Sequence, residues 1–171
     1  MVKPRWLGGG IKFLKHRTNF VGYMKNSIWV IDDDSDDHEL IRDILEELDV
    51  NNEVRFFHTA KECLMALESV KTAPFLIMCD VNIPGTDGFA LRETLLKTPN
   101  KKFHGVPFIF WSSYASEQQI ERAYRLRAHG FFIKEAEFNE WKDSFAAIIK
   151  YWSKSKMPSK NESYDEPMSA N

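Results

Sequence analysis

The stretch IWVIDDD at residues 28–34 decides the fold, because its short apolar run ends abruptly in three carboxylates. The pattern recurs where FLIMCD at residues 75–80 ends in Asp80 and where FFIK at residues 131–134 ends in Lys134. Short apolar runs that stop at charged residues are typical of strands buried in a parallel sheet. Since ligands bind beyond the carboxyl ends of such strands, we expect these charged residues to meet at one crevice.

Acidic residues at this crevice favour a divalent cation. The carboxylates of Asp32, Asp33 and Asp80 would repel one another at close range unless a cation joined them. Mg²⁺ is the candidate, because it is a hard cation that prefers oxygen ligands. Alone, an acidic triplet is more often a solvated turn or a helix cap, and Asp34 is expected to face solvent.

Short apolar runs alternate with amphipathic segments from Ser27 onward. In the first of these segments, Leu40, Ile41 and Ile44 recur at helical spacing. Strands are predicted at residues 27–32, 53–57, 75–80, 107–112 and 131–134, and helices at residues 36–48, 60–70, 88–97, 116–127 and 138–152. Five such strand–helix units predict an α/β fold, a doubly wound parallel sheet with helices on both faces.

Four motifs follow one another in the order and at the spacings of a known family. They are VIDD at residues 30–33, DVNIPGTDG at residues 80–88, WSS at residues 111–113 and GFFIK at residues 130–134. Together they resemble the receiver domain of two-component response regulators, over residues 26–152. The resemblance implies a flavodoxin-like sheet with the strand order 2-1-3-4-5, in which the first and third strands flank the crevice.

The resemblance implies a phosphoryl-transfer site around Asp80. This residue would accept a phosphoryl group from a histidine kinase or a histidine phosphotransfer protein, in a Mg²⁺-dependent reaction that yields an aspartyl phosphate. By the same resemblance, Mg²⁺ would be held by Asp33 and Asp80, by Asp32 largely through a bound water, and by the main-chain carbonyl of Asn82.

Three further residues acquire roles from the resemblance. Lys134 would pair with one oxygen of the phosphoryl group as a compact point charge. Ser112 would donate its hydroxyl to another oxygen, with Ser113 as the competitor for that role. Phe131 stands at the family's switch position, where its ring would turn inward as Ser112 moves toward the phosphoryl group.

The segment after Lys134 departs from the family pattern. Proline commonly follows the lysine, with a cis bond before it, whereas Glu135 follows here. A cis bond before a non-proline residue costs about 2.5–4 kcal/mol. The loop is therefore expected either to be trans and differently shaped or to hold a strained cis bond. Phe131 also lacks the hydroxyl group of the tyrosine that is common at its position.

The two ends of the chain differ in composition from the middle. The net charge of −2 comes from 23 basic and 25 acidic residues, yet residues 1–25 carry six basic residues and no acidic one. Either Met24 is the true start and residues 1–23 come from an upstream start, or this basic extension docks on a partner or on anionic lipid. Residues 153–171 predict a disordered polar tail, so no DNA-binding output domain is expected beside the receiver domain.

The composition also argues against several partners and settings. The acidic body argues against binding to nucleic acid phosphates. No apolar stretch approaches the roughly 20 residues that a membrane span needs. Cys63 and Cys79 form no spaced pattern, which favours a reduced, cytoplasmic setting.

The leading hypothesis is a stand-alone, single-domain response regulator. It would catalyse only its own phosphorylation and dephosphorylation, and would signal when residues 116–127, 131–134 and 138–152 offer a changed surface to an output protein or a second copy. The alternative is a receiver-like interaction module that works without phosphorylation. A third hypothesis is a phosphatase or phosphotransferase of small metabolites, but the tandem Asp32-Asp33 in place of Asp-x-Asp, without a cap insertion, argues against it.

Overall fold

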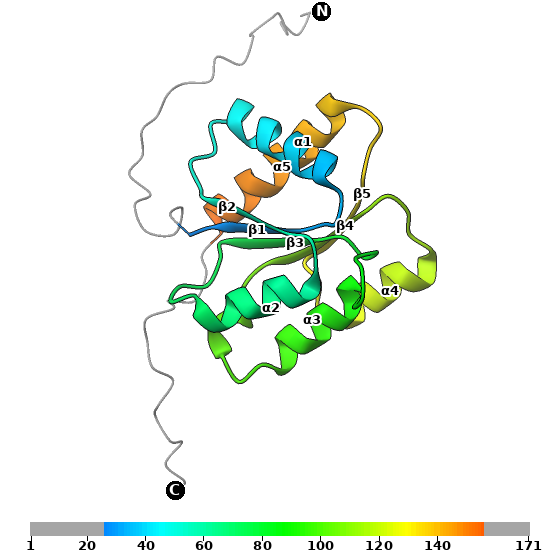
Figure 1. Ribbon diagram of the computed structural model, residues 1–171. Coiled ribbons are helices and arrows are strands. Elements are labelled where there is room, and N and C mark those ends of the chain that lie inside the picture. The colour runs from blue at the N-terminus through cyan, green and yellow to red at the C-terminus, as the bar shows by residue number, and fades with distance from the viewer. Residues whose placement is uncertain (1–25, 156–171) are drawn as a thin grey trace, which may run out of the picture.

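A computed structural model describes residues 26–155. Residues 1–25 and 156–171, which include the predicted basic extension and most of the predicted tail, lie outside the described residues. The strands are β1 (Ile28–Ile31), β2 (Val54–Phe57), β3 (Leu76–Cys79), β4 (Phe108–Ser112) and β5 (Gly130–Ile133), and the helices are α1 (Ser35–Glu47), α2 (Ala60–Ser69), α3 (Gly88–Lys97), α4 (Glu117–Arg125) and α5 (Phe138–Lys154). The sheet lies between two helical layers, with α1 and α5 on one face and α2, α3 and α4 on the other (Figure 1).

All five strands run parallel, in the order β2-β1-β3-β4-β5. The register pairs Ile31 at the end of β1 with Cys79 at the end of β3. It likewise pairs Ser112 with Ile133 at the ends of β4 and β5. The carboxyl ends of the strands therefore lie along one edge of the sheet. This arrangement confirms the predicted doubly wound, flavodoxin-like fold.

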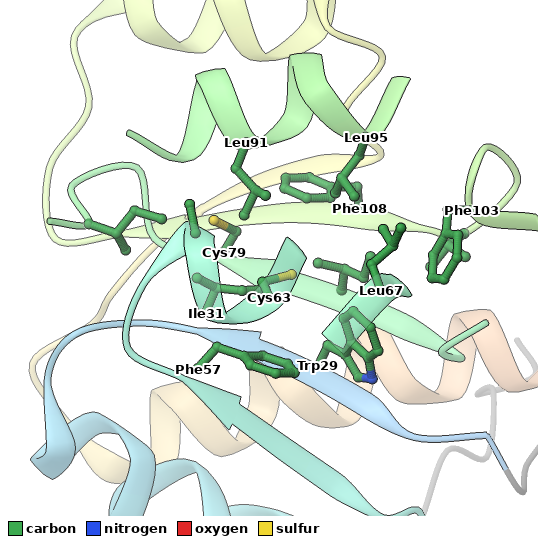
Figure 2. Close-up of a cluster of buried hydrophobic side chains, with 14 of the residues drawn as sticks. Trp29, Ile31, Phe57, Cys63, Leu67, Cys79, Leu91, Leu95, Phe103 and Phe108 are labelled. Carbon is green, nitrogen blue, oxygen red and sulfur yellow. The ribbon is translucent and has the colours of Figure 1, made fainter. Parts of the chain in front are cut away.

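Each face of the sheet carries its own hydrophobic core, because successive residues of a strand point to opposite faces. In β1, Trp29 and Ile31 belong to the cluster that α2 and α3 cover (Figure 2). Ile28 and Val30 belong to the other cluster, which α1 and α5 cover. Strands β1, β3 and β4 are buried along their whole length. This double burial explains why their sequences read as continuous apolar runs rather than as an alternation.

The loop between β3 and α3 brings the start of α3 against Asp80. A Cβ at Gly88, the first residue of α3, would collide with the main-chain carbonyl of Asp80. Gly85 has a positive φ of 80°, a conformation that glycine adopts without steric cost. Asp87 caps α3 by accepting from the N–H of Ala90 at 2.7 Å. These features fix the carboxyl end of β3.

Two details differ from the sequence-based prediction. A short 3-10 helix at Lys101–Phe103 is not signalled by the apolar pattern. Helix α5 continues to Lys154, two residues into the segment predicted as a disordered tail. The apolar periodicity stops at Trp152, but the N–H of Ser155 still donates to the carbonyl of Tyr151 at 3.1 Å and closes a last turn. Within residues 26–155, no helix is both long and apolar enough to cross a membrane.

Candidate functional site

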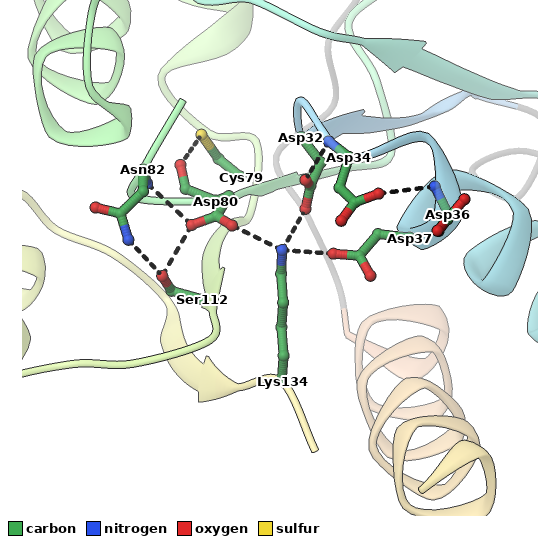
Figure 3. Close-up of polar contacts among 9 residues, drawn as sticks. All are labelled: Asp32, Asp34, Asp36, Asp37, Cys79, Asp80, Asn82, Ser112 and Lys134. Atoms are coloured by element: carbon green, nitrogen blue, oxygen red, sulfur yellow. Dashed lines mark hydrogen bonds and ion pairs between the residues drawn. The ribbon is translucent and has the colours of Figure 1, made fainter. Parts of the chain in front are cut away.

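Four of the predicted site residues gather at the carboxyl edge of the sheet (Figure 3). Asp32 directly follows β1, Asp80 directly follows β3, Ser112 ends β4 and Lys134 directly follows β5. Each apolar run holds its strand in the sheet and stops where its polar residue reaches the edge. The fold thereby brings together residues as far as 102 positions apart in the sequence.

The ammonium group of Lys134 lies at the centre of the site. Its Nζ is 2.7 Å from Oδ2 of Asp32, 2.6 Å from Oδ2 of Asp37 and 2.7 Å from Oδ2 of Asp80. A lysine ammonium has three N–H donors, so these bonds use all of them. The side chain of Lys134 is only 9% exposed, and a cation this buried requires paired anions. Lys134 and the three carboxylates therefore hold one another in place.

For both Asp32 and Lys134, burial and ion pairing shift the pKa in opposite directions. Burial raises the pKa of Asp32 from 3.8 to about 6, and its hydrogen bond to Lys134 offsets the rise only in part. Burial lowers the pKa of Lys134, but the bonds to its three carboxylates outweigh burial and raise that pKa above its ordinary value. Lys134 therefore keeps its charge near neutral pH, whereas Asp32 changes charge just below it.

The second oxygen of Asp80 is held by neutral donors. Its Oδ1 accepts from the hydroxyl of Ser112 at 2.8 Å and from the main-chain N–H of Asn82 at 2.9 Å. Ser112 is fully buried, whereas its competitor Ser113 is exposed, so the structure places Ser112 beside Asp80. The side-chain amide of Asn82 lies 3.5 Å from the Ser112 hydroxyl. Donors on both oxygens fix the orientation of the Asp80 carboxylate.

The acidic residues after Asp32 lie at the rim of the site. Asp33 is exposed, and its side chain makes no hydrogen bond or ion pair to any other residue in the described part of the chain. Asp34 is exposed as expected, and it also caps α1 by accepting from the N–H of Asp36 at 2.9 Å. The structure thus joins Asp32 and Asp80 through Lys134 and leaves Asp33 outside that cluster.

The oxygen donors fit Mg²⁺, although no group of three or more His, Cys, Asp or Glu side chains among residues 26–155 is arranged as a metal site. Asp32 and Asp80 offer buried carboxylates, and Asp33 offers an unpaired carboxylate beside them. All of these are hard oxygen ligands. Burial raises the pKa of Asp32, and a bound cation would oppose this rise, because it favours the ionised form of a nearby carboxylate. The assignment of the individual ligands, including the carbonyl of Asn82, stays a prediction.

Asp37 is the site residue that the sequence analysis misses. Asp37 lies in the first turn of α1, where a negative charge is favourable at any helix N-terminus. Its presence there therefore gives no sign of a second role. That helix begins at the same edge where β1 ends, so acidic residues in its first turn lie at the rim of the crevice. Place in the topology, rather than spacing to Asp32, is the signal that could have indicated Asp37.

The loop after β5 resolves the alternatives left by Glu135. Residues 26–155 contain no cis peptide bond, so the Lys134–Glu135 bond is trans. The N–H of Lys134 donates to the carbonyl of Ser112 at 2.9 Å and extends the pairing of β4 with β5. The indole N–H of Trp141 donates to the carbonyl of Glu135 at 2.6 Å. These two bonds hold the loop on either side of Lys134 without a proline.

Phe131 lies at the partly buried edge of the sheet in β5. It packs against the hydrophobic cluster under α2 and α3, and its ring centroid is 5.9 Å from that of Phe110. Ser112 already donates to Asp80 in this arrangement. Ser112 therefore already lies beside the predicted acceptor, and the switch at Ser112 and Phe131 stays a prediction.

Comparison with known proteins agrees with this geometry. The family model of the response regulator receiver domain matches residues 28–146. Among curated proteins, the Fimbriae Z protein of Salmonella typhimurium is 29% identical over 120 residues, which make up 69% of this chain and 55% of that protein. The chain thus spans about half the length of this relative, whose activity as a whole protein does not transfer.

Solved structures show the same fold. The phosphorylated cyanobacterial phytochrome response regulator RcpA superposes with a TM-score of 0.71 at 23% identity, over 79% of this chain and 99% of that one. The Mn²⁺-bound form of the response regulator Rcp1 superposes with a TM-score of 0.69 at 17% identity, over 78% and 99% of the two chains. At these identities the likeness concerns the fold alone.

Proposed function

This chain belongs to the response regulator receiver domain family, and we propose that it accepts a phosphoryl group on Asp80. Proteins of this family act in two-component signalling rather than as ordinary enzymes. The proposed donor is a histidine kinase or a histidine phosphotransfer protein. The proposed output is a protein–protein interaction that depends on the phosphorylation of Asp80.

One observation carries the proposal: the Asp80 carboxylate lies between an ammonium group and a hydroxyl group. Lys134 Nζ is 2.7 Å from one oxygen, and Ser112 Oγ is 2.8 Å from the other. Asp80 is only 6% exposed, so these donors act in a place where water screens little. Such donors stabilise charge that accumulates on a phosphoryl group in flight, which is the main requirement of this chemistry.

The transfer itself makes one bond and breaks another. An oxygen of Asp80 attacks the phosphorus of a phosphohistidine, and an acyl phosphate forms as the phosphorus–nitrogen bond breaks. The bonding electron pair stays on the imidazole nitrogen of the donor, which then binds a proton. Lys134 would turn toward one phosphoryl oxygen and Ser112 toward another, because both already lie against the attacking carboxylate.

Asp32, Asp33, Asp80 and the main-chain carbonyl of Asn82 would hold Mg²⁺, which when bound neutralises charge on the phosphoryl oxygens. These candidate ligands differ in burial and in their contacts. Asp32 stands buried beside Lys134, and Asp33 stays accessible at the rim. Asn82 is held by its N–H to Asp80, which places its peptide unit beside the acceptor.

The output surface is proposed at α4, β5 and α5. Most of the large apolar side chains that residues 26–155 expose lie on or next to these elements, namely Tyr114, Ile120, Tyr124, Ile133 and Tyr151. Exposed apolar patches mark interaction sites, and these side chains belong to the elements around β5, the strand at one edge of the sheet. The partner would be an output protein or a second copy of the chain.

Uptake of label from acetyl phosphate tests the proposal. The unaltered chain is expected to take up label only with Mg²⁺, and Asp80→Asn to take up none. Asp87→Asn is the matched control, because it removes a carboxylate from the same loop while asparagine still caps α3. Partner binding without any uptake of label would instead favour the interaction module that works without phosphorylation.

A further inference from the structure

The ammonium group of Lys134 donates to Asp32, Asp37 and Asp80, which would have different roles in the proposed reaction. Asp80 would carry the phosphoryl group, and Asp32 would turn toward the metal ion. Asp37 has neither task. Within residues 26–155, its carboxylate hydrogen-bonds Lys134 alone. In the proposed reaction, Asp37 is therefore the acceptor that would be free to stay with Lys134 throughout the transfer.

Asp37 is held firmly enough to serve as an anchor. It lies in the first turn of α1, which Asp34 caps. The same side of α1 is buried in the following turns through Ile41, Ile44 and Leu45, which recur at helical spacing from Asp37. The Asp37 side chain is 19% exposed, so its 2.6 Å bond to Lys134 is only partly open to solvent screening. A helix that is fixed by its buried side thus presents this carboxylate to the ammonium group.

We propose that Asp37 is a positioning residue, which holds the ammonium group of Lys134 beside Asp80 during phosphoryl transfer. The inference rests on the proposed function. When Asp32 and Asp80 turn to other partners, Lys134 would keep one fixed bond, and its charge would stay where negative charge accumulates. Without Asp37, the long side chain of Lys134 would regain rotamer freedom and reach the transfer geometry less often.

Asp37 would have the opposite effect on the rate if its negative charge mainly repelled the phosphoryl donor. A carboxylate at the rim repels an incoming phosphate dianion, and its removal would then speed the reaction. Positioning and repulsion predict changes of opposite sign in the rate of uptake. The rate therefore decides between them.

Asp37→Asn and Asp36→Asn form a matched pair. Both remove one charge from the first turn of α1, but Asp36 makes no hydrogen bond to Lys134. We expect the initial rate of label uptake from acetyl phosphate with Mg²⁺ to fall roughly tenfold in Asp37→Asn. The rate is expected to stay within about twofold in Asp36→Asn, whose exposed charge contributes little. Asp37→Glu keeps the carboxylate and should recover part of the rate.

A spectroscopic readout separates positioning from a change in folding. The ammonium signal of Lys134 in ¹H–¹⁵N spectra should be protected from exchange in the unaltered chain and in Asp36→Asn, and lost in Asp37→Asn. Uptake by Asp37→Asn at the normal rate or faster, or an unchanged ammonium signal, would overturn the positioning role. An unaltered chain that takes up no label would overturn the proposed function itself, which the ammonium signal does not depend on.

Discussion

The indole N–H of Trp141 in α5 donates to the main-chain carbonyl of Glu135 at 2.6 Å, directly after Lys134. Trp141 is buried, and its ring packs 5.2 Å from that of Trp111, the residue before Ser112. One side chain of α5 thus contacts the loop that carries Lys134 and the strand that carries Ser112. The bond holds the loop at Glu135, the position where the family pattern commonly has proline.

Trp141→Phe should destabilise the fold by about 1–2 kcal/mol, because it removes the N–H donor to Glu135 and some buried area. Chemical denaturation measures the free energy of unfolding. Trp152→Phe is the control, since Trp152 is only half-buried and makes ring contacts but no indole hydrogen bond among the described residues. Equal losses in both variants would show that the bond to Glu135 contributes nothing.

Gly88→Ala should cost about 1–3 kcal/mol, because the added Cβ meets the main-chain carbonyl of Asp80 and the backbone must shift. Gly105→Ala is matched to it, since a Cβ there meets nothing within 4 Å. Thermal and chemical unfolding of the two variants should therefore differ clearly. If Gly88→Ala were as stable as Gly105→Ala, the close packing of α3 on the carboxyl end of β3 would be wrong.

The raised pKa of Asp32 predicts how stability changes with pH. Between pH 3.8 and about 6 the native state keeps a proton on Asp32 that the unfolded chain has lost. The contribution of Asp32 to the free energy of unfolding is therefore present below pH 3.8 and is lost as the pH rises through 6, by at most about 3 kcal/mol.

Denaturation of the unaltered chain and of Asp32→Asn across this pH range measures that contribution as a difference. As the pH rises, the free energy of unfolding of the unaltered chain should fall relative to that of Asp32→Asn. The fall should level off above the pKa of Asp32. Asp33→Asn controls for the loss of one charge at the exposed rim. A difference that shifts in favour of the unaltered chain over the same range would show that the ion pair with Lys134 outweighs burial.

Mg²⁺ binding should distinguish the two acidic residues at the rim. Asp33→Ala is expected to weaken binding more than Asp34→Ala, because the Asp34 carboxylate already accepts the N–H of Asp36, whereas the Asp33 carboxylate is unpaired. Fluorescence of buried Trp111, next to Ser112, can follow the titration. The reverse order would mean that the metal assignment is shifted by one residue.

Much of the fold follows from the sequence, because the strands β1, β3 and β4 are buried on both faces and can therefore be recognised as continuous apolar runs. The predicted helix at residues 88–97 agrees with α3 as observed, since Asp87 caps one end and Gly88 marks its start. The gathering of Asp32, Asp80, Ser112 and Lys134 also follows, because parallel strands end at one edge.

The remaining features depend on contacts that no local pattern carries. The bond between Asp37 and Lys134 joins residues 97 positions apart and arises from how α1 leaves the sheet. In the trans loop after Lys134, the carbonyl of Glu135 accepts from Trp141, a contact between segments that no local pattern signals. Asp33 adjoins Asp32 in the sequence but lies outside the cluster, because adjacent residues after a strand point in different directions.

Intact-mass analysis with peptide mapping, after incubation with acetyl phosphate and Mg²⁺, tests most directly whether Asp80 is the phosphoacceptor. We expect a single added phosphoryl group per chain, labile to hydroxylamine as an acyl phosphate is, on the peptide that contains Asp80. The adduct should be absent when Mg²⁺ is removed and absent in Asp80→Asn. A stable adduct on Ser112 or Ser113, or no adduct on a folded chain with Mg²⁺ present, would contradict the assignment of Asp80 as the phosphoacceptor.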